Sequence, residues 1–161
     1  MTGPDDLPLT SPDSERLDLL IRLLKLCSLI NVPMNEGVCN PSGLSQTELK
    51  VVMALSGEGE LAGHELMRIL GAPAMSVSRA IAALRTNGLV EDSNDPDNRR
   101  RRPVRLSAAG EAFYAAAMPD IAAVADALLG SLTARQRREL ARIADEVIAA
   151  MVNWGTHRTD D

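Results

Sequence analysis

Residues 65–90 read "ELMRILGAPAMSVSRAIAALRTNGLV" and contain two short helical patterns separated by a turn with glycine and proline. The first pattern covers about residues 64–70 and stops at Gly71, and the second covers about residues 73–87 and stops at Gly88. Two short helices joined by a tight turn predict a helix-turn-helix.

The second helical pattern separates into two faces when it is projected at about 100° per residue. One face is apolar and is expected to lie in the core: Val77, Ala80, Ile81 and Leu84. The opposite face begins with Met75 and Arg79, has Ser76 and Ser78 at its flanks, and continues with short side chains. A helix that enters the major groove of DNA needs such a face, with donors near its amino end.

Residues 89–107 predict a two-stranded antiparallel hairpin, because "LVEDS" and "RPVRLS" alternate apolar and polar residues around the turn "NDPDN". Pro103 cannot donate a ladder hydrogen bond, so we expect it to face away from the pairing or to lie at an edge. A run of arginines, Arg99 to Arg102, lies at the tip. Such a run by itself is more often a solvated face than a nucleic-acid contact, but its place directly after a helix-turn-helix favours DNA.

The charge of the chain is uneven. The whole protein has a net charge of -5, whereas residues 76–106 carry seven arginines against four acidic residues, or +3. A local basic patch on an acidic protein indicates one specific anionic contact surface.

The segments on both sides are expected to be helical. We predict a disordered acidic tail over residues 1–12, and a helix and loop over 13–43 that begins at the cap Ser11 and whose helix carries two apolar stripes. "NVPMNEGVCNPSG", residues 31–43, is expected to be the loop, and Ser45 with Glu48 forms a capping box for the next helix.

Towards the carboxyl end, Ser107 is expected to cap a helix that Pro119 kinks or interrupts. A last helix begins with a capping box of Thr133 and Gln136 and carries one apolar stripe, and residues 155–161 form a tail.

Residues 44–110 resemble the winged helix-turn-helix of the MarR family of bacterial transcription regulators. The resemblance is carried by "LSQTELKVVMAL", by the helix-turn-helix, and by "DPDNRRRRPVRLSAAG", which matches the family's wing signature without a gap. It implies a mainly α (α+β) fold, in which the terminal helices, including residues 111–154, intertwine with a second copy in a homodimer. The dimer is then expected to bind a near-palindromic double-stranded operator as a repressor that a small-molecule effector releases.

The resemblance and the helix faces together nominate the site residues. For DNA contact we expect Ala74, Met75, Ser76, Ser78, Arg79, Arg99, Arg100, Arg101 and Arg102. For the dimer interface we expect Leu17, Leu20, Leu24, Leu140, Ile143, Val147, Ile148 and Met151. For an effector cleft between the helical region and the winged lobe, the candidates are Cys27, Met53 and Tyr114.

The sequence departs from the family pattern in two places. Asn98 stands where the family has an acid in the wing, so a neutral amide replaces a carboxylate that would orient an arginine. Ala74 and Met75 stand where the recognition helix commonly starts with polar or basic residues, which predicts contact with thymine methyl groups and more reading of groove shape.

The sequence leaves two alternatives to a DNA-binding repressor and offers no support for an enzyme. No enzyme motif occurs, and neither a cofactor nor a metal site is expected, because His64 and His157 are isolated. A redox-sensing regulator that acts through Cys27 or Cys39 is an alternative, although Cys27 lies in an apolar stripe that favours an inert thiol, whereas Cys39 is expected to be exposed in the loop. A helical dimerisation module without DNA binding is another. Without an apparent signal peptide or an uninterrupted apolar span, we expect a cytoplasmic protein without a membrane partner.

Overall fold

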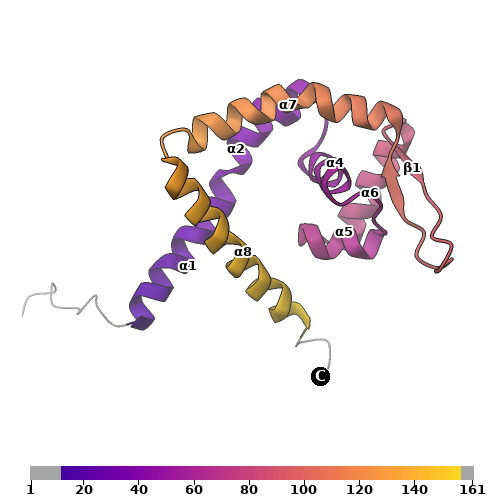
Figure 1. Cartoon of the computed structure of the whole chain (residues 1–161). Coiled ribbons are helices and arrows are strands. Elements are labelled where there is room, and N and C mark those ends of the chain that lie inside the picture. Colours follow the sequence, from indigo (N-terminus) through magenta and orange to yellow (C-terminus); the bar gives the residue numbers. More distant parts are fainter. Residues whose placement is uncertain (1–11, 157–161) are drawn as a thin grey trace, which may run out of the picture.

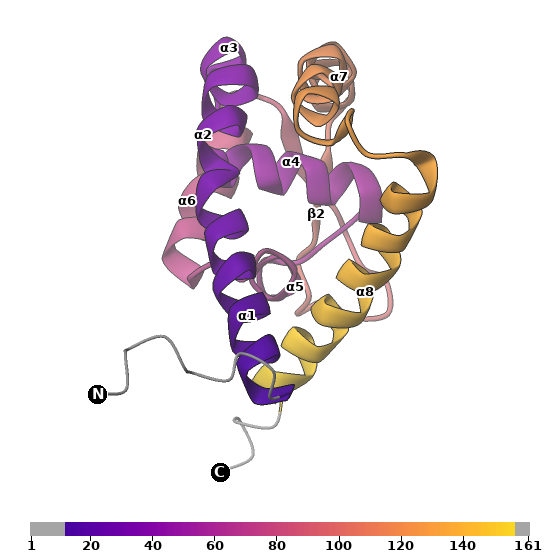
Figure 2. The ribbon, with the colours of Figure 1, turned by 90° about the vertical axis from the view of Figure 1, so that its left-hand side faces the viewer.

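The computed structural model describes residues 12–156, which are mainly helical with one small hairpin. Figure 1 shows helix α7 (Ala108–Leu129) as an arch, with the hairpin and helices α4 to α6 below one end of it. Helices α1 (Pro12–Leu29) and α8 (Ala134–Thr156) lie on the side away from the hairpin, as the turned view in Figure 2 also shows. The expected cap Ser11, most of the amino-terminal tail and His157 lie outside the described residues.

The core of the molecule lies in the winged helix-turn-helix. It contains α4 (Gln46–Glu58), α5 (Gly63–Leu70), α6 (Ala74–Thr86), β1 (Val90–Asp92) and β2 (Val104–Leu106). Its side chains interdigitate in one buried cluster, in which Leu66 and Leu84 are fully buried. The predicted capping box begins α4: Glu48 N–H donates to Ser45 Oγ, and Ser45 N–H donates to the Glu48 carboxylate.

The hairpin pairs Val90 with Leu106 and Asp92 with Val104 in antiparallel register. Val104 also bridges to Leu61 on the segment that connects α4 and α5, which anchors β2 on its other side. Pro103 is buried and directly precedes β2, outside the paired residues Val104–Leu106, so its missing N–H breaks no ladder bond. Its carbonyl accepts a bond from Ser93 N–H. We call β1, β2 and residues 93–103 between them the wing.

The segment expected as a loop after α1 is helical instead. It forms α2 (Asn31–Met34), a π-helical turn η1 (Asn35–Cys39) and α3 (Asn40–Ser42), and ends at Gly43 in the left-handed conformation. The local composition is overridden by packing, because Val38 and Cys39 are buried against Leu49 and α7. Gly37 allows this approach: a Cβ there would lie 2.4 Å from Val124 Cγ2.

Helix α7 continues across Pro119, so Pro119 does not interrupt the helix. A proline removes one backbone hydrogen bond, and the packing of α7 against η1 and α4 holds the helix on both sides of it. By length and composition alone α7 could span a membrane, a test that core helices of soluble proteins also pass; 11% of its apolar window is buried in the single chain. It carries Glu111, Asp120 and Asp126 and covers the winged core, which argues for a structural helix.

The outer helices leave large apolar faces uncovered. No residue of α1 is buried, and Leu17, Leu20 and Leu24 are 58%, 51% and 60% exposed. On α8 the capping box of Thr133 and Gln136 is formed as predicted, and Ile148 and Met151 are more than half exposed. Helix α8 reaches Thr156, so any tail begins later than residue 155.

Candidate nucleic-acid interface

The turn between α5 and α6 aims the second helix outwards. Helix α5 ends at Gly71, whose left-handed backbone reverses the chain, and Pro73 in an extended conformation precedes α6. No side chain caps the amino end of α6 and no acidic residue lies in its first turn. The positive end of the helix dipole at Ala74 and Met75 is therefore available to an anion such as a phosphate.

The two predicted faces of α6 are present. Val77, Ala80 and Leu84 are buried in the core. The opposite face is accessible: Ala74, Ser78 and Arg79 are exposed, Ser76 is half-buried, and Met75 is 65% exposed. A large exposed apolar side chain among small residues suits close contact with the methyl group of thymine.

The tip of the wing is organised by bonds from side chains to the backbone. Asp95 Oδ1 accepts from the N–H groups of Asp97 and Asn98, at 3.0 and 3.2 Å. Asn98 Oδ1 accepts from Arg100 N–H at 3.1 Å. Arg102 then takes a left-handed φ of 45° as the chain turns into β2. The tip is thus a built turn that presents its arginines in a set order.

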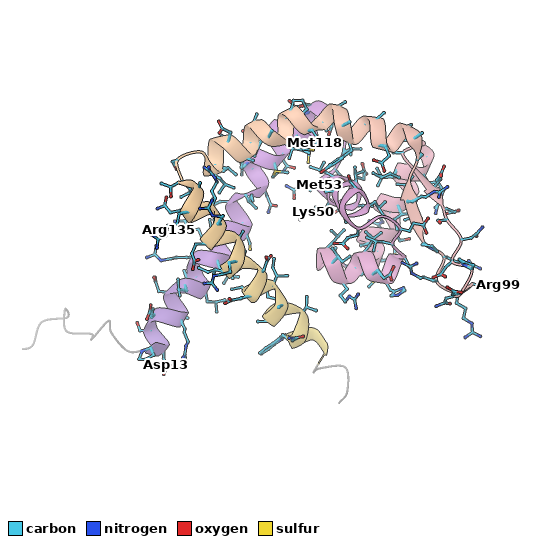
Figure 3. All side chains as sticks on the ribbon, in the orientation of Figure 1. Asp13, Lys50, Met53, Arg99, Met118 and Arg135 are labelled. Carbon is cyan, nitrogen blue, oxygen red and sulfur yellow. The ribbon has the colours of Figure 1, made fainter. Side chains whose placement is uncertain are left out.

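The wing arginines fall into two groups. Arg99, Arg100 and Arg102 are exposed and have no ion pair within residues 12–156; Figure 3 shows Arg99 at the tip, pointing away from the protein. Arg101 does not share this position: it pairs with Glu65 and Asp95, and its side chain is only 24% exposed. On β2, Arg105 pairs with Glu91 and Glu60.

Arg101 and Glu65 change each other's titration. The pKa of Glu65 lies below its ordinary value. The largest cause is the hydrogen bonding from Arg101 to the Glu65 carboxylate, and the next is the bond from Ala62 N–H. The same carboxylate raises the pKa of Arg101. The residues that engage Arg101 were not foreseen, because Glu65 lies 36 residues away and looks in the sequence like an ordinary acid in a first helical turn. Of the two carboxylate partners of Arg101, only Asp95 could have been predicted from the sequence, because it lies six residues away within the wing signature.

The cleft candidates are partly brought together. Cys27 and Met53 line one apolar pocket of ≈ 430 Å³ beside α4. Lys50 also lines this pocket, and Figure 3 labels Lys50 and Met53 on α4. Sequence reasoning missed the other residues that line it: Ile30, Asn31, Met34, Cys39, Gln46, Leu49 and Lys50. Tyr114 packs instead against the winged core.

The cysteines differ from expectation. Cys27 is exposed in the single chain, whereas Cys39 is buried, with 3% of its surface accessible. Burial is the main cause that raises the pKa of the Cys39 thiol. Among residues 12–156, no group of three side chains could hold a metal ion.

Comparisons with known proteins agree with this geometry. Residues 42–101 match the sequence model of the MarR family. No curated protein matches the chain in sequence. A MarR family transcriptional regulator from Silicibacter pomeroyi DSS has the same fold, with a TM-score of 0.80 and 21% identity over 92% of this chain and 99% of that one.

Two further solved structures share the fold. One is a mutant MarR from E. coli complexed with operator DNA, with a TM-score of 0.67 and 19% identity over 86% of this chain and 99% of that one. The other is BpsR of Bordetella bronchiseptica, whose DNA binding is regulated by 6-hydroxynicotinic acid, with a TM-score of 0.67 and 18% identity over 82% of this chain and 98% of that one.

Proposed function

We propose that this chain is a member of the MarR family, whose sequence model matches residues 42–101, and that it is a homodimeric repressor that binds a near-palindromic operator. The observation that carries the proposal is the joint exposure of the uncapped amino end of α6 and of Arg99, Arg100 and Arg102 on the wing. The first element is suited to the major groove, and the second to phosphates and the minor groove. The protein acts as a cytoplasmic regulator, not as an enzyme.

The contacts divide between the two elements. Met75 meets thymine methyl groups, Ser76 and Ser78 donate to base edges or phosphates, and Arg79 binds phosphate or guanine. The exposed wing arginines follow the backbone and the groove beside it. Because α6 offers few donors, the width and flexibility of the DNA contribute much of the selectivity.

The dimer is supported by the apolar faces of α1 and α8. Eight side chains were expected there; all except the half-buried Val147 are at least 44% exposed: Leu17, Leu20, Leu24, Leu140, Ile143, Ile148 and Met151. Helices this apolar are covered in soluble proteins, and a second copy of the chain provides the matching surface. Two recognition helices then address half-sites about 34 Å apart.

Release from DNA is proposed to come from a small molecule in the pocket that Cys27 and Met53 line. Its walls are mainly apolar, and Lys50 is the one cation among its lining residues. This lining suits a small molecule with an apolar body and one anionic group. The pocket lies between α1, α2 and α4, so a ligand that fits one spacing of these helices better shifts the separation of the two winged lobes. BpsR, whose DNA binding responds to a small molecule, supports this mode of regulation.

The test is an equilibrium binding assay with the DNA upstream of the protein's own gene, over a series of salt concentrations. The wild type should bind a specific site. Its log K should fall linearly with log salt, and each phosphate contact should make that negative slope steeper by about 0.9. Replacing Arg99 and Arg100 together by alanine should weaken binding and reduce the slope. If the wild type does not bind even at low salt, or if the double variant keeps the wild-type affinity and slope, the proposal fails.

A further inference from the structure

Arg101 lies within the basic run of the wing, yet its guanidinium is occupied by the protein. Nη2 donates to Glu65 Oε2 at 2.9 Å and to the Glu60 carbonyl at 3.0 Å. Nε donates to both Glu65 oxygens at 3.2 Å, and Nη1 donates to Asp95 Oδ2 at 3.2 Å. Every nitrogen of the side chain is thus engaged within the winged core.

These bonds join three separate segments. Glu60 precedes α5, Glu65 lies in its first turn, and Asp95 lies in the tip of the wing. The carboxylates are themselves held, because Glu65 Oε2 accepts from Ala62 N–H at 2.7 Å and Asp95 Oδ1 accepts from two N–H groups of the tip. A planar guanidinium that bonds in several directions fixes the orientation of all three segments.

The wing needs such an anchor. Its strands pair over three residue pairs, from Val90–Leu106 to Asp92–Val104, while residues 93–103 extend beyond them. A short two-stranded ribbon is marginally stable by itself. The bridge of Leu61 to Val104 holds the base of the wing, and Arg101 with Asp95 ties its tip to α5.

We propose that Arg101 is a positioning residue that sets the angle between the wing and the recognition helix, and does not itself contact DNA. The inference rests on the proposed function, since the angle matters for a protein that places α6 and the wing on one duplex. The positive charge that contacts DNA comes from Arg99, Arg100 and Arg102, whereas Arg101 orients the wing that carries them.

The direction in which Glu65→Gln changes DNA affinity separates this positioning role from a simple electrostatic effect. Glu65→Gln keeps a side-chain oxygen for Ala62 N–H but removes the negative charge that Arg101 needs. If Glu65 were only an acid near the DNA, its neutralisation would tighten binding. If it holds the wing through Arg101, its neutralisation weakens specific binding.

The experiment compares the full-length wild type with Arg101→Ala, Arg101→Lys, Glu65→Gln, Arg99→Ala and a remote control, Lys25→Ala on α1. Affinity for the operator and for unrelated DNA is measured over a salt series, together with the thermal unfolding midpoint. We expect Arg101→Ala and Glu65→Gln to lower the ratio of specific to non-specific affinity on the order of tenfold at an unchanged salt slope. Arg101→Lys should recover only part of this ratio, because an ammonium group cannot bridge the same partners.

Arg99→Ala should instead reduce the slope by about 0.9, and Lys25→Ala should match the wild type. The proposal is overturned if Arg101→Ala reduces the slope as Arg99→Ala does, if Glu65→Gln tightens operator binding, or if Arg101→Lys behaves as the wild type.

A second measurement needs no DNA and keeps the two proposals distinguishable. Hydrogen exchange of the backbone amides of residues 93–103 should be faster in Arg101→Ala and Glu65→Gln, while exchange in α4 and α6 stays as in the wild type. Unchanged exchange in the wing overturns the positioning role even if the wild type binds DNA. A wild type that binds no DNA, with a wing that loosens in both variants, refutes the proposed function and leaves Arg101 as the anchor of the wing.

Discussion

Nη2 of Arg101 lies 2.9 Å from Oε2 of Glu65, although 36 residues separate the two in the sequence. Arg100, its neighbour in the chain, is exposed and has no ion pair among residues 12–156. Adjacent arginines of one basic run therefore have different surroundings. The charge that the wing offers to a phosphate backbone is smaller than its five arginines suggest, because Arg101 in the run and Arg105 on β2 are already paired with carboxylates.

Glu65→Gln should remove part of the acid sensitivity of the fold. Hydrogen bonds from Arg101 hold the pKa of Glu65 below its ordinary value, which is about 4.3 in an unfolded chain. The resulting stabilisation is present above that unfolded pKa and is lost as the pH falls through the lower folded-state pKa. Urea denaturation from about pH 7 down to about pH 3 should show a steeper loss of unfolding free energy for the wild type than for the variant. Parallel curves would contradict this coupling.

Leu24→Glu should dissociate the proposed dimer. Leu24 is 60% exposed in the single chain and lies on an apolar stripe of α1. A carboxylate buried there without a partner should raise the dissociation constant of the dimer on the order of tenfold or more, as measured by sedimentation equilibrium. Lys25→Glu places the same side chain on the neighbouring polar position and should leave the dimer intact. If Leu24→Glu remains as dimeric as the wild type, this face of α1 is not the interface.

Asn98→Asp should change operator affinity little, whereas Asn98→Ala should weaken it. The amide oxygen of Asn98 already accepts from Arg100 N–H at 3.1 Å, so a carboxylate would largely repeat its bond. Alanine removes that bond from an exposed turn, which should destabilise the ordered conformation of the wing tip by about 0.5 to 1 kcal/mol. Fluorescence polarisation with operator DNA measures both. A marked gain in affinity or selectivity for Asn98→Asp would show that the amide leaves the wing arginines under-oriented.

Cys39 should resist thiol reagents in the folded protein. It is buried, and burial raises the pKa of its thiol, so little nucleophilic thiolate forms near neutral pH. Alkylation with iodoacetamide in a Cys27→Ser variant, followed by mass spectrometry, should modify Cys39 slowly in buffer and rapidly in denaturing urea. Equal rates in the two conditions would restore Cys39 as a candidate redox sensor.

The helix-turn-helix, the capping boxes at Ser45 and Thr133 and the hairpin could be predicted because their signals are local. Apolar periodicity assigns the buried face of α6, and a cap needs only residues a few positions apart. The likeness to the MarR wing signature also lies in one continuous stretch, residues 95–110. These features hold in the structure because no distant contact opposes them.

Tertiary packing decided what local signals could not. Residues 31–42 have the composition of a loop, yet they are helical because Val38 and Cys39 are buried and Gly37 lets Val124 approach. The uninterrupted course of α7 across Pro119 has the same cause. The sequence by itself determined the helix-turn-helix, the hairpin and the two capping boxes, and that the wing is basic. Only the fold, by bringing Glu65 and Asp95 to Arg101, decided which arginines face solvent, because an ion pair depends on distance in space rather than on order in the chain.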